Sequence, residues 1–397
     1  MARYTQTHPW LTFTFDLQRA PPILWLLLGE ARSKIEHLAG VPLRPSTAQE
    51  MRRISLVRGA LATTAIEGNT LSEEEANRYL EDQSSLPKSR RYMGEEFRNV
   101  VLACNAIWQR FTESDDEELT LERILEYNRQ VLLNTAHSDE VTPGEWRAYA
   151  VGVGRYRAPD AAEVPELMRR FVDWFASDAF RQEPFFEDKA GPATMSILGA
   201  ILAHLYFAWI HPFGDGNGRT ARLLEFALLL RADVPTVAAH LLSNHYNDTR
   251  PEYYRQLERA SATHDPIPFV VYALQGFVDG LRAQNAKVRK EQLEVSWLNY
   301  VHEAFHDQTG EVAKRRRDVV LALSTQPAPV HRDSIPLLSP TLARQYAALN
   351  PKTLGRDLQI LAEMGLVEEV DKVRWQARIR DIESFIPARR TRVRTGR

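Results

Sequence analysis

A twelve-residue run from His211 to Arg222, HPFGDGNGRTAR, holds the side chains of this chain that are best suited to chemistry. The imidazole of His211 titrates near neutral pH, so it can take a proton from an attacking hydroxyl group. Asp215 offers hard oxygen ligands, which suit Mg²⁺ bound against phosphates. Arg219 and Arg222 are three residues apart, so they share one face of a helix, and each guanidinium group can bind a phosphate through two hydrogen bonds. The run therefore predicts a site for the phosphates of a nucleotide.

Apolar stretches at residues 195–210 and 223–230 flank this run and predict two helices that are joined by a glycine-rich loop. Glycine lets backbone N–H groups approach an anion, and a helix N-terminus carries partial positive charge. For any one of these residues alone, a tight turn without a ligand is the alternative. The candidates for phosphate contacts in the loop are Gly214, Gly216, Asn217 and Gly218.

The run resembles the signature of the Fic family, His-x-Phe-x-(Asp/Glu)-Gly-Asn-Gly-Arg-x-x-Arg, at every fixed position. The resemblance implies a mainly α protein with a Fic helical core that transfers AMP from ATP to a Ser, Thr or Tyr hydroxyl of a target protein, self-modification included. It also implies the roles of the individual residues: His211 as the general base, Asp215 as the Mg²⁺ ligand, Asn217 and the backbones of Gly216 and Gly218 as α- and β-phosphate contacts, Arg219 as a phosphate contact that supports the loop, Arg222 as the γ-phosphate contact, and Phe213 as a core anchor beneath the loop.

A second motif, Thr63-Thr-Ala-Ile-Glu-Gly68, resembles the inhibitory helix of the same family, (Ser/Thr)-x-x-x-Glu-(Gly/Asn). If Glu67 reaches Arg222, the resulting ion pair takes the place of the γ-phosphate and its arginine. We expect Thr63 to begin or brace this helix. The alternative is an ordinary helix end, with Glu67 in solvent and Gly68 as its C-cap. In some relatives the equivalent glutamate also helps to remove AMP from modified targets, and the sequence leaves that activity open.

Two further segments fit the same resemblance. The alternation of side chains over residues 148–157 predicts two short strands, which in the family form a flap that aligns the target by strand addition, with Arg147 as an anchor. A plain surface hairpin is the alternative. Residues 243–254 resemble the segment that borders the adenosine, where Asn247 and Tyr254 are the candidate contacts. For the tyrosines at 253 and 254, half-buried helix positions are the alternative.

The C-terminal residues differ in charge from the rest of the chain. Residues 311–397 hold 17 Lys and Arg against 10 Asp and Glu, a net charge of +7, although the chain as a whole carries −2. The pattern there predicts three helices and a hairpin, and residues 352–366 resemble the recognition helix and wing of winged helix-turn-helix domains. Duplex DNA is one expected partner, and a docking or dimerisation module is the alternative. The outward candidates for DNA contacts are Lys352, Thr353, Arg356 and Gln359.

From these patterns we expect an N-terminal helical region that carries the inhibitory motif at residues 1–118, a Fic core at 119–310, a winged helix at 311–385 and a basic tail at 386–397. Glycines at 276 and 280 leave open whether residues 266–308 form one helix or two. The single cysteine, Cys104, lies in an apolar helical pattern and favours a reducing compartment, the cytoplasm. No apolar run is long enough to predict a membrane span. A homodimer is compatible with the sequence.

The prediction is thus a self-inhibited protein adenylyltransferase that uses ATP and Mg²⁺. One alternative is a Fic enzyme that transfers another phosphate-containing group. The other is a DNA-binding regulator whose Fic site senses a nucleotide without turnover, although a pure sensor does not need the base His211.

Overall fold

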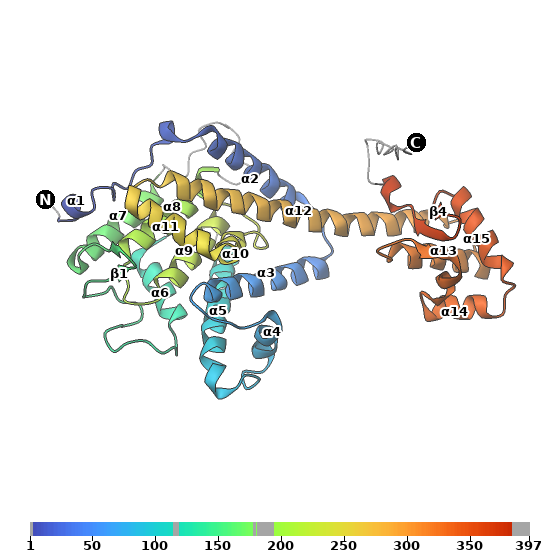
Figure 1. The fold of residues 1–397 in the computed structure, drawn as a ribbon, viewed down its shortest axis with the longest axis horizontal. Helices are drawn as coiled ribbons and strands as arrows, with labels where there is room; N and C mark the ends of the chain where they lie inside the picture. Colours follow the sequence, from blue (N-terminus) through green and yellow to red (C-terminus); the bar gives the residue numbers. More distant parts are fainter. Residues whose placement is uncertain (1–2, 114–118, 178–179, 181–193, 383–397) are drawn as a thin grey trace, which may run out of the picture. The chain divides into compact units, whose positions relative to one another are not determined.

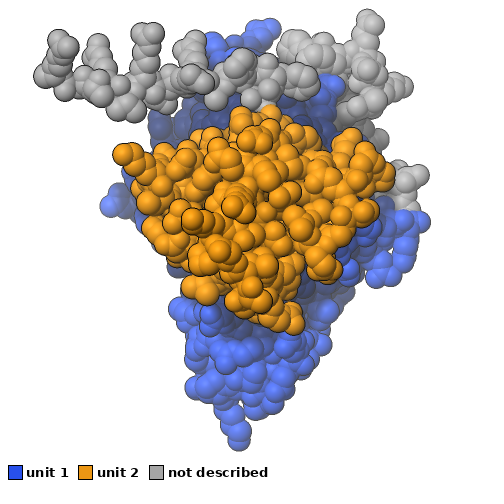
Figure 2. Space-filling view, turned by 90° about the vertical axis from the view of Figure 1, so that its right-hand side faces the viewer, with its two compact units in different colours: residues 1–286 blue, residues 287–397 orange. Residues whose placement is uncertain are grey.

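The computed structural model describes residues 3–113, 119–177, 180 and 194–382, and the predicted basic tail at 386–397 lies outside these residues. The described chain is mainly helical and forms two compact units, Met1–Ala286 and Lys287–Arg397 (Figures 1 and 2). Among the described helices, none combines the length and the apolar character needed to cross a membrane.

The first unit is built around two central helices, α8 (Thr194–Ile210) and α9 (Asn217–Arg231), which pack against each other. Nearly every described side chain of α8 is buried, as its continuous apolar sequence requires. The helices that surround this pair by direct contact are α2 (Pro22–Gly40), α3 (Pro45–Ala65), α5 (Arg91–Glu113), α6 (Leu121–Val131) and α7 (Val164–Ala176). The predicted loop therefore connects the two central helices of the unit.

The remaining elements of this unit are shorter. Helix α1 (Tyr4–Thr7) lies near the N-terminus, and α4 (Glu73–Glu81) begins at a capping box formed by Ser72 and Glu75. Helices α10 (Leu241–Asp248) and α11 (Arg250–Thr263) follow α9. Strands β1 (Gly152–Val153) and β2 (Tyr156–Arg157) form an antiparallel hairpin, which confirms the two short strands predicted from the sequence.

Residues 267–304 form one continuous helix, α12 (Ile267–Ala304), which settles the choice between one helix and two. Its glycines serve close packing, because a Cβ at Gly276 would lie 2.0 Å from the ring of His245, and one at Gly280 would lie 3.0 Å from Leu241. Both neighbours belong to α10. The glycines therefore mark a close helix contact and not a break.

The second unit begins within α12, whereas the sequence pattern changes only at residue 311. Trp297, Val301 and Phe305 near the end of α12 belong to the buried core of this unit, so the helix contributes side chains there before the change in charge begins. Likewise, α3 and α5 pack directly on α9, so the expected N-terminal region and Fic core form one compact unit.

The second unit holds the helices and the hairpin that the sequence predicted. Helices α13 (Glu311–Ser324), α14 (Pro340–Ala347) and α15 (Lys352–Glu363) precede β4 (Val367–Asp371) and β5 (Arg374–Ala377), and a short strand β3 (Val330–His331) pairs with β5 to give the sheet order β3-β5-β4. Asp357 of α15 is 1% exposed and accepts hydrogen bonds from Arg315 and Arg316 of α13 at 2.8 Å. This charged contact fixes α15 on α13.

Candidate active site

The loop between α8 and α9 is fixed by two left-handed residues and a buried ring. His211 has φ 48° and Gly216 has φ 74°, and α9 begins directly after Gly216. A Cβ at Gly216 would lie 3.0 Å from the side-chain amide of Asn128, so both the backbone and the space favour glycine there. Phe213 is 1% exposed and stacks on Trp146 at 4.9 Å, which confirms it as an anchor in the core.

Asn217 closes the loop through both ends of its amide. Its Oδ1 accepts from the backbone N–H of Phe213 at 2.9 Å, and its Nδ2 donates to the backbone carbonyl of the same residue at 2.8 Å. The acceptor and one donor of this buried amide thus hold the loop, and its predicted contact with a phosphate stays a prediction. Asn217 shapes the loop that presents the neighbouring backbone N–H groups.

His211 is held by its own backbone and by Arg147, which is buried. The Arg147 guanidinium donates to the carbonyls of His211 and Tyr149 at 2.8 Å and of Pro159 at 2.7 Å. Its backbone N–H donates to the carbonyl of Pro212 at 3.0 Å. One cation thus ties the start of the loop to both sides of the β1–β2 hairpin, which confirms Arg147 as the predicted anchor.

The imidazole of His211 is neutral at physiological pH. Burial lowers its pKa to about 4, against the carboxylates of Glu67 and Asp215, which raise it. A neutral imidazole has a free lone pair, so it can accept a proton from a hydroxyl group.

Arg222 contacts the end of the inhibitory segment. Its Nη2 lies 2.6 Å from Oε1 of Glu67 and donates to the backbone carbonyl of Thr63 at 2.8 Å. The Arg222 side chain is 1% exposed and that of Glu67 is 37% exposed. Burial raises the pKa of Glu67, but the charges of Arg222, Arg219 and Arg250 outweigh that effect and hold the pKa below its usual value. The predicted contact between Glu67 and Arg222 is therefore present.

The positions of Thr63 and Gly68 refine the second motif. Thr63 lies inside α3, two residues before its end at Ala65, so the expectation that it begins a helix is wrong; its backbone carbonyl supplies the contact to Arg222. Gly68 has φ 101°, a conformation that favours glycine after a helix. The helix therefore ends near Gly68, as one alternative expected, and Glu67 still contacts Arg222, as the other expected.

Both signature arginines keep unused donors in the interior. Nε and Nη1 of Arg219 and of Arg222 are buried nitrogens without a hydrogen-bond acceptor in the described part of the chain. A buried donor without an acceptor is costly, and phosphate oxygens supply acceptors of opposite charge. Gly218 lies between them, and a Cβ there would approach Oε1 of Glu67 to 2.2 Å. The side of α9 that bears Gly218 is thus shaped for a polyanion.

The surroundings of Asp215 suit a carboxylate that holds a metal together with bound phosphates. Its side chain is 42% exposed, and its Oδ1 accepts from the backbone N–H of Gly216 at 2.5 Å and lies 3.3 Å from Nη2 of Arg219. Within the described residues, no cluster of three or more metal-binding side chains exists. Mg²⁺ needs no such cluster, because one or two carboxylates, phosphates and water complete its octahedron.

A cavity of about 1100 Å³ lies over these residues within the first unit. The first-motif residues His211, Asn217, Gly218 and Arg222 line it with Glu67. Its other walls come from the β1–β2 hairpin, from α11, and from the segment before α2. A volume of this size is enough for a nucleotide and a segment of a target.

Of the two candidate adenosine contacts, Tyr254 lines the cavity and Asn247 does not. Tyr254 lines the cavity and its hydroxyl donates to the carbonyl of Ile66 at 3.0 Å, so it also holds the end of the inhibitory segment. Tyr253, its neighbour, is 3% exposed and hydrogen-bonds His204 at 2.9 Å. Asn247 lies on α10, and the described residues that line the cavity do not include it. The contact of Asn247 with the adenosine therefore stays a prediction.

Asn128 of α6 is a loop contact that the sequence reasoning missed. Its Nδ2 donates to the backbone carbonyl of Asp215 at 3.0 Å and its Oδ1 accepts from the N–H of Gly144 at 2.9 Å. Asn128 is 1% exposed. It belongs to a helix 87 residues before its partner, so no local spacing marks it. Gly214 also packs closely, because a Cβ there would lie 2.2 Å from the Tyr149 hydroxyl.

The candidate DNA contacts lie on α15 in the second unit. Lys352, Arg356 and Gln359 are exposed and Thr353 is half-buried, whereas Leu354, Leu358 and Leu361 of the same helix are buried. The predicted outward direction of the four polar side chains agrees with this pattern.

Comparison with known proteins gives one family. The sequence profile of the Fic/DOC family matches residues 118–229. The chain is 30% identical over 270 residues to protein adenylyltransferase fic-1 of Caenorhabditis elegans, which covers 64% of this chain and 49% of that protein. It is 33% identical over 208 residues to protein adenylyltransferase Fic of Drosophila willistoni, which covers 52% of this chain and 37% of that protein. The chain thus spans about half or less of the length of these relatives.

Solved structures show the same fold. Fic-1 from C. elegans, residues 134–508, aligns with a TM-score of 0.52 at 26% identity over 68% of this chain and 73% of that structure. A Fic family protein from Desulfovibrio desulfuricans G20 aligns with a TM-score of 0.53 at 21% identity over 90% and 96%. The complete signature loop between α8 and α9 lies inside the segment that matches the Fic/DOC family, and the described chain shares the mainly α fold of these structures.

Proposed function

We propose that the chain is a self-inhibited protein adenylyltransferase, which transfers AMP from ATP to a Ser, Thr or Tyr hydroxyl of a target protein. The observation that carries the proposal is the arrangement of one cavity: His211, Arg222 and Glu67 line it, Arg222 has unused donors, and Glu67 forms an ion pair with Arg222. The names of the relatives support AMP as the transferred group.

The triphosphate would lie along the N-terminus of α9, where the backbone N–H groups after Gly216, the charge of Arg219 and the unused donors of Arg222 neutralise its charge. His211 takes the proton from the target hydroxyl. The hydroxyl oxygen then forms a bond to the α-phosphorus, and the bond from the α-phosphorus to the bridging oxygen breaks, which releases pyrophosphate. Asp215 would hold Mg²⁺, which neutralises phosphate charge when it is bound.

Inhibition follows from competition for one guanidinium group. While Glu67 holds Nη2 of Arg222 at 2.6 Å, its carboxylate repels a γ-phosphate at the same position. ATP would then bind, if at all, with its α-phosphorus out of line with the target hydroxyl. Release of Glu67 restores the arginine to the nucleotide. Because Glu67 lines the same cavity as His211, we propose that its carboxylate activates a water against an AMP-modified target, which would make de-AMPylation a second activity of this site.

The flap role of the β1–β2 hairpin belongs to this proposal. Val153, Gly154 and Tyr156 line the cavity from the hairpin, and Arg147 fixes the hairpin on the loop of His211. A target segment that pairs with the hairpin would bring its hydroxyl to His211. A segment of the chain itself, or of a second copy in a homodimer, could use the same surface. Because the buried thiol of Cys104 suits a reducing compartment, we place the activity in the cytoplasm.

Mass spectrometry after incubation with ATP and Mg²⁺ tests the proposal. We expect the Glu67→Gly variant to modify itself or added proteins by the mass of one AMP, faster than the natural chain does, and the double variant with His211→Ala to leave the masses unchanged. A gain equal to phosphate, or to another nucleotide when that nucleotide is supplied, would identify the alternative Fic enzyme that transfers a different group. No modification by Glu67→Gly would contradict the proposal and favour a nucleotide sensor.

We propose separately that the second unit is a winged helix that binds duplex DNA. The supporting observation is the exposed face of α15, with Lys352, Arg356 and Gln359 opposite a buried leucine row. Fluorescence anisotropy with a labelled duplex at two salt concentrations is the test. We expect binding that weakens steeply with salt and with Lys352→Ala plus Arg356→Ala. Absence of binding at low salt would indicate a protein-docking or dimerisation module instead.

A further inference from the structure

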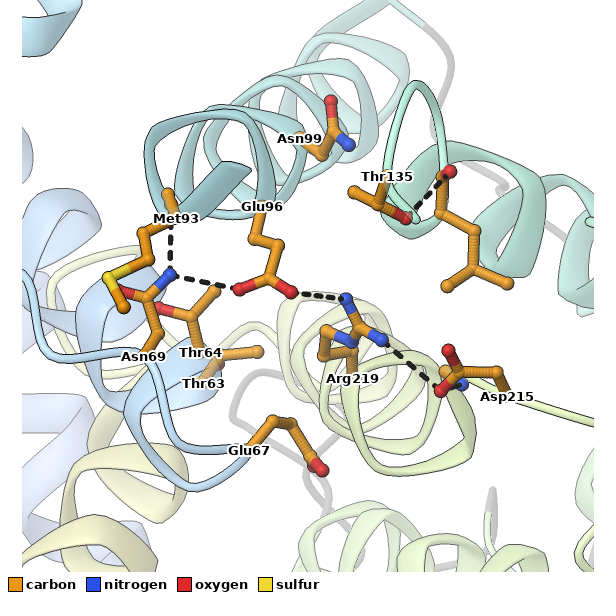
Figure 3. A network of polar contacts seen from close by, with 12 residues as sticks. Thr63, Thr64, Glu67, Asn69, Met93, Glu96, Asn99, Thr135, Asp215 and Arg219 are labelled. Carbon is orange, nitrogen blue, oxygen red and sulfur yellow. Dashed lines mark hydrogen bonds and ion pairs between the residues drawn. The ribbon is translucent and has the colours of Figure 1, made fainter. Parts of the chain in front are cut away.

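A row of polar contacts links the turn after Glu67 to the phosphate loop (Figure 3). Asn69 donates from Nδ2 to Oε2 of Glu96 at 3.0 Å and to the backbone carbonyl of Met93 at 2.8 Å. The other oxygen of Glu96, Oε1, lies 3.6 Å from Nη1 of Arg219. Nη2 of Arg219 in turn lies 3.3 Å from Oδ1 of Asp215. Neither motif of the sequence includes Glu96, which stands on α5.

The contacts lie largely out of solvent except at Asp215, whose side chain is 42% exposed. Asn69 is 7% exposed, Arg219 is 6% exposed, and the side chain of Glu96 is 22% exposed. Helix α5 packs on both α3 and α9, so the backbone that carries Glu96 is fixed relative to both ends of the row. Coulombic interactions are stronger and less screened in such surroundings than at the surface.

Arg219 is shared between two carboxylates. Within the described residues, its ion-pair partners are Glu96 and Asp215, at 3.6 and 3.3 Å, and both distances are longer than a short charge-assisted hydrogen bond. Without the charge of Glu96, Asp215 would be the remaining partner, and the guanidinium group would pair with it more closely. A cation that needs the Asp215 carboxylate would then compete with Arg219 for it.

Through its hydrogen bond with Asn69, Glu96 also contacts the turn that carries Glu67. Asn69 follows Glu67 by two residues, and its Oδ1 also accepts from the N–H of Leu71 at 3.1 Å. The hydrogen bonds from Asn69 to α5 oppose any movement of the turn of residues 66–69 that would carry Glu67 away from Arg222. The side chain that balances Arg219 is thus also the anchor of the inhibitory turn.

We infer that Glu96 is a positioning residue that couples the Arg219–Asp215 pair to the inhibitory turn. It keeps Arg219 from forming a shorter ion pair with Asp215, and through Asn69 it holds Glu67 in its inhibitory position. This inference rests on the proposed function for the meaning of "inhibitory" and of the metal at Asp215. It predicts opposite effects at the two ends of the row. Loss of the charge at Glu96 weakens metal binding with ATP, whereas loss of the Asn69 bonds releases inhibition.

The first experiment measures binding without turnover. The parent is the Glu67→Gly, His211→Ala chain, and calorimetry gives its affinity for Mn²⁺ in the presence of saturating ATP. We expect Glu96→Gln to weaken Mn²⁺ binding about fivefold or more and Glu96→Asp, which keeps the charge, to restore most of the affinity. The matched control is Glu95→Gln, whose carboxylate on the same helix accepts from the Tyr79 hydroxyl instead. Equal Mn²⁺ affinity of the parent and Glu96→Gln would overturn the inference.

The second experiment measures steady-state AMP transfer. In the Glu67→Gly chain, Glu96→Gln should raise the KM for Mg²⁺ with little change in kcat, a division that general loss of structure would not produce. In the chain that retains Glu67, Asn69→Ala should raise the basal rate threefold or more, whereas the neighbouring control Thr70→Ala should not. In the Glu67→Gly chain Asn69→Ala should add nothing. An Asn69→Ala rate equal to that of the natural chain would overturn the anchoring role.

The two experiments separate this inference from the proposed function. The binding measurement requires no transfer. Mn²⁺ affinities that follow the prediction, together with no AMP transfer by the Glu67→Gly chain that keeps His211, would contradict the proposed function and support the balance of charge at Arg219. AMP transfer by Glu67→Gly with the same dependence on metal concentration after Glu96→Gln would support the proposed function and contradict the inference about Glu96.

Discussion

Replacement of Glu67 by glycine should make the empty protein less stable and the nucleotide-bound protein relatively more stable. The carboxylate of Glu67 is the acidic partner of Arg222, whose side chain is 1% exposed. Its removal leaves a buried guanidinium group with the Thr63 carbonyl as its described acceptor. A polyanion that supplies new acceptors therefore repairs a defect that the substitution created.

The magnitude follows from the burial of the two partners. Breaking a fully buried ion pair by removing one partner costs about 3–5 kcal/mol. Because the Glu67 side chain is 37% exposed, water reaches part of the contact, and we expect a loss of about 1–3 kcal/mol in the free energy of unfolding. A ligand at about one hundred times its Kd then adds roughly 2.7 kcal/mol to the folded state.

Urea unfolding of the natural chain and of Glu67→Gly, each with and without ATP and Mg²⁺, measures both effects. We expect the variant to unfold at lower urea than the natural chain when both are empty. With nucleotide, the variant should gain at least as much as it lost, whereas the natural chain should gain less, since Glu67 competes with the γ-phosphate. Glu73→Gln is a matched control, because Glu73 pairs with Arg58 at the surface, with side chains 45% and 50% exposed. Its loss should change the free energy by less than about 1 kcal/mol.

Two results would refute this reasoning. One is equal stability of the empty variant and the natural chain, which would mean that the contact between Glu67 and Arg222 contributes nothing. The other is an equal gain from nucleotide in both proteins, which would mean that Glu67 does not compete with the triphosphate.

Three further predictions concern the surroundings of the site. Arg147→Met removes the cation that binds the carbonyls of the loop and hairpin, and should lower the free energy of unfolding by roughly 3–5 kcal/mol in urea titrations. Since the pKa of His211 lies at about 4, kcat/KM of the Glu67→Gly chain should stay level as pH falls from about 8 to about 5. The free energy of unfolding should fall between about pH 6.5 and 4, where the unfolded chain binds the proton before the folded chain does. A loss of kcat/KM centred near pH 6.5 would contradict a buried neutral base. Gly276→Ala places a Cβ 2.0 Å from the His245 ring and should cost about 1–3 kcal/mol in thermal or urea unfolding, with no change expected if the helices separate freely.

The sequence predicted the site where local spacing carries the chemistry. The loop residues lie within six positions of one another, so one turn and one helix start place them, and the structure has them there. The contact between Glu67 and Arg222 joins residues 155 apart, and only a motif with a known counterpart could predict it. Its geometry is present, and its inhibitory role stays a prediction.

The missed contacts share a physical reason. Asn128 and Glu96 are single polar residues in amphipathic helices, and such residues normally face solvent, so their sequence gives no sign of a partner on α9. The contacts of Asn217 with the Phe213 backbone also depend on the fold of the loop, so local spacing does not predict them. The glycines at 276 and 280 left one helix or two open, because their close contact with α10 joins residues that are distant in the sequence.

The most direct test of the central claim uses two samples of ATP, one labelled at the α-phosphorus and the other at the γ-phosphorus, with the Glu67→Gly chain and Mg²⁺. The account predicts that protein acquires label from the first sample and none from the second, that the chain with Glu67 intact acquires far less, and that His211→Ala abolishes the transfer. Label from the γ-position, or equal labelling with and without Glu67, would contradict it.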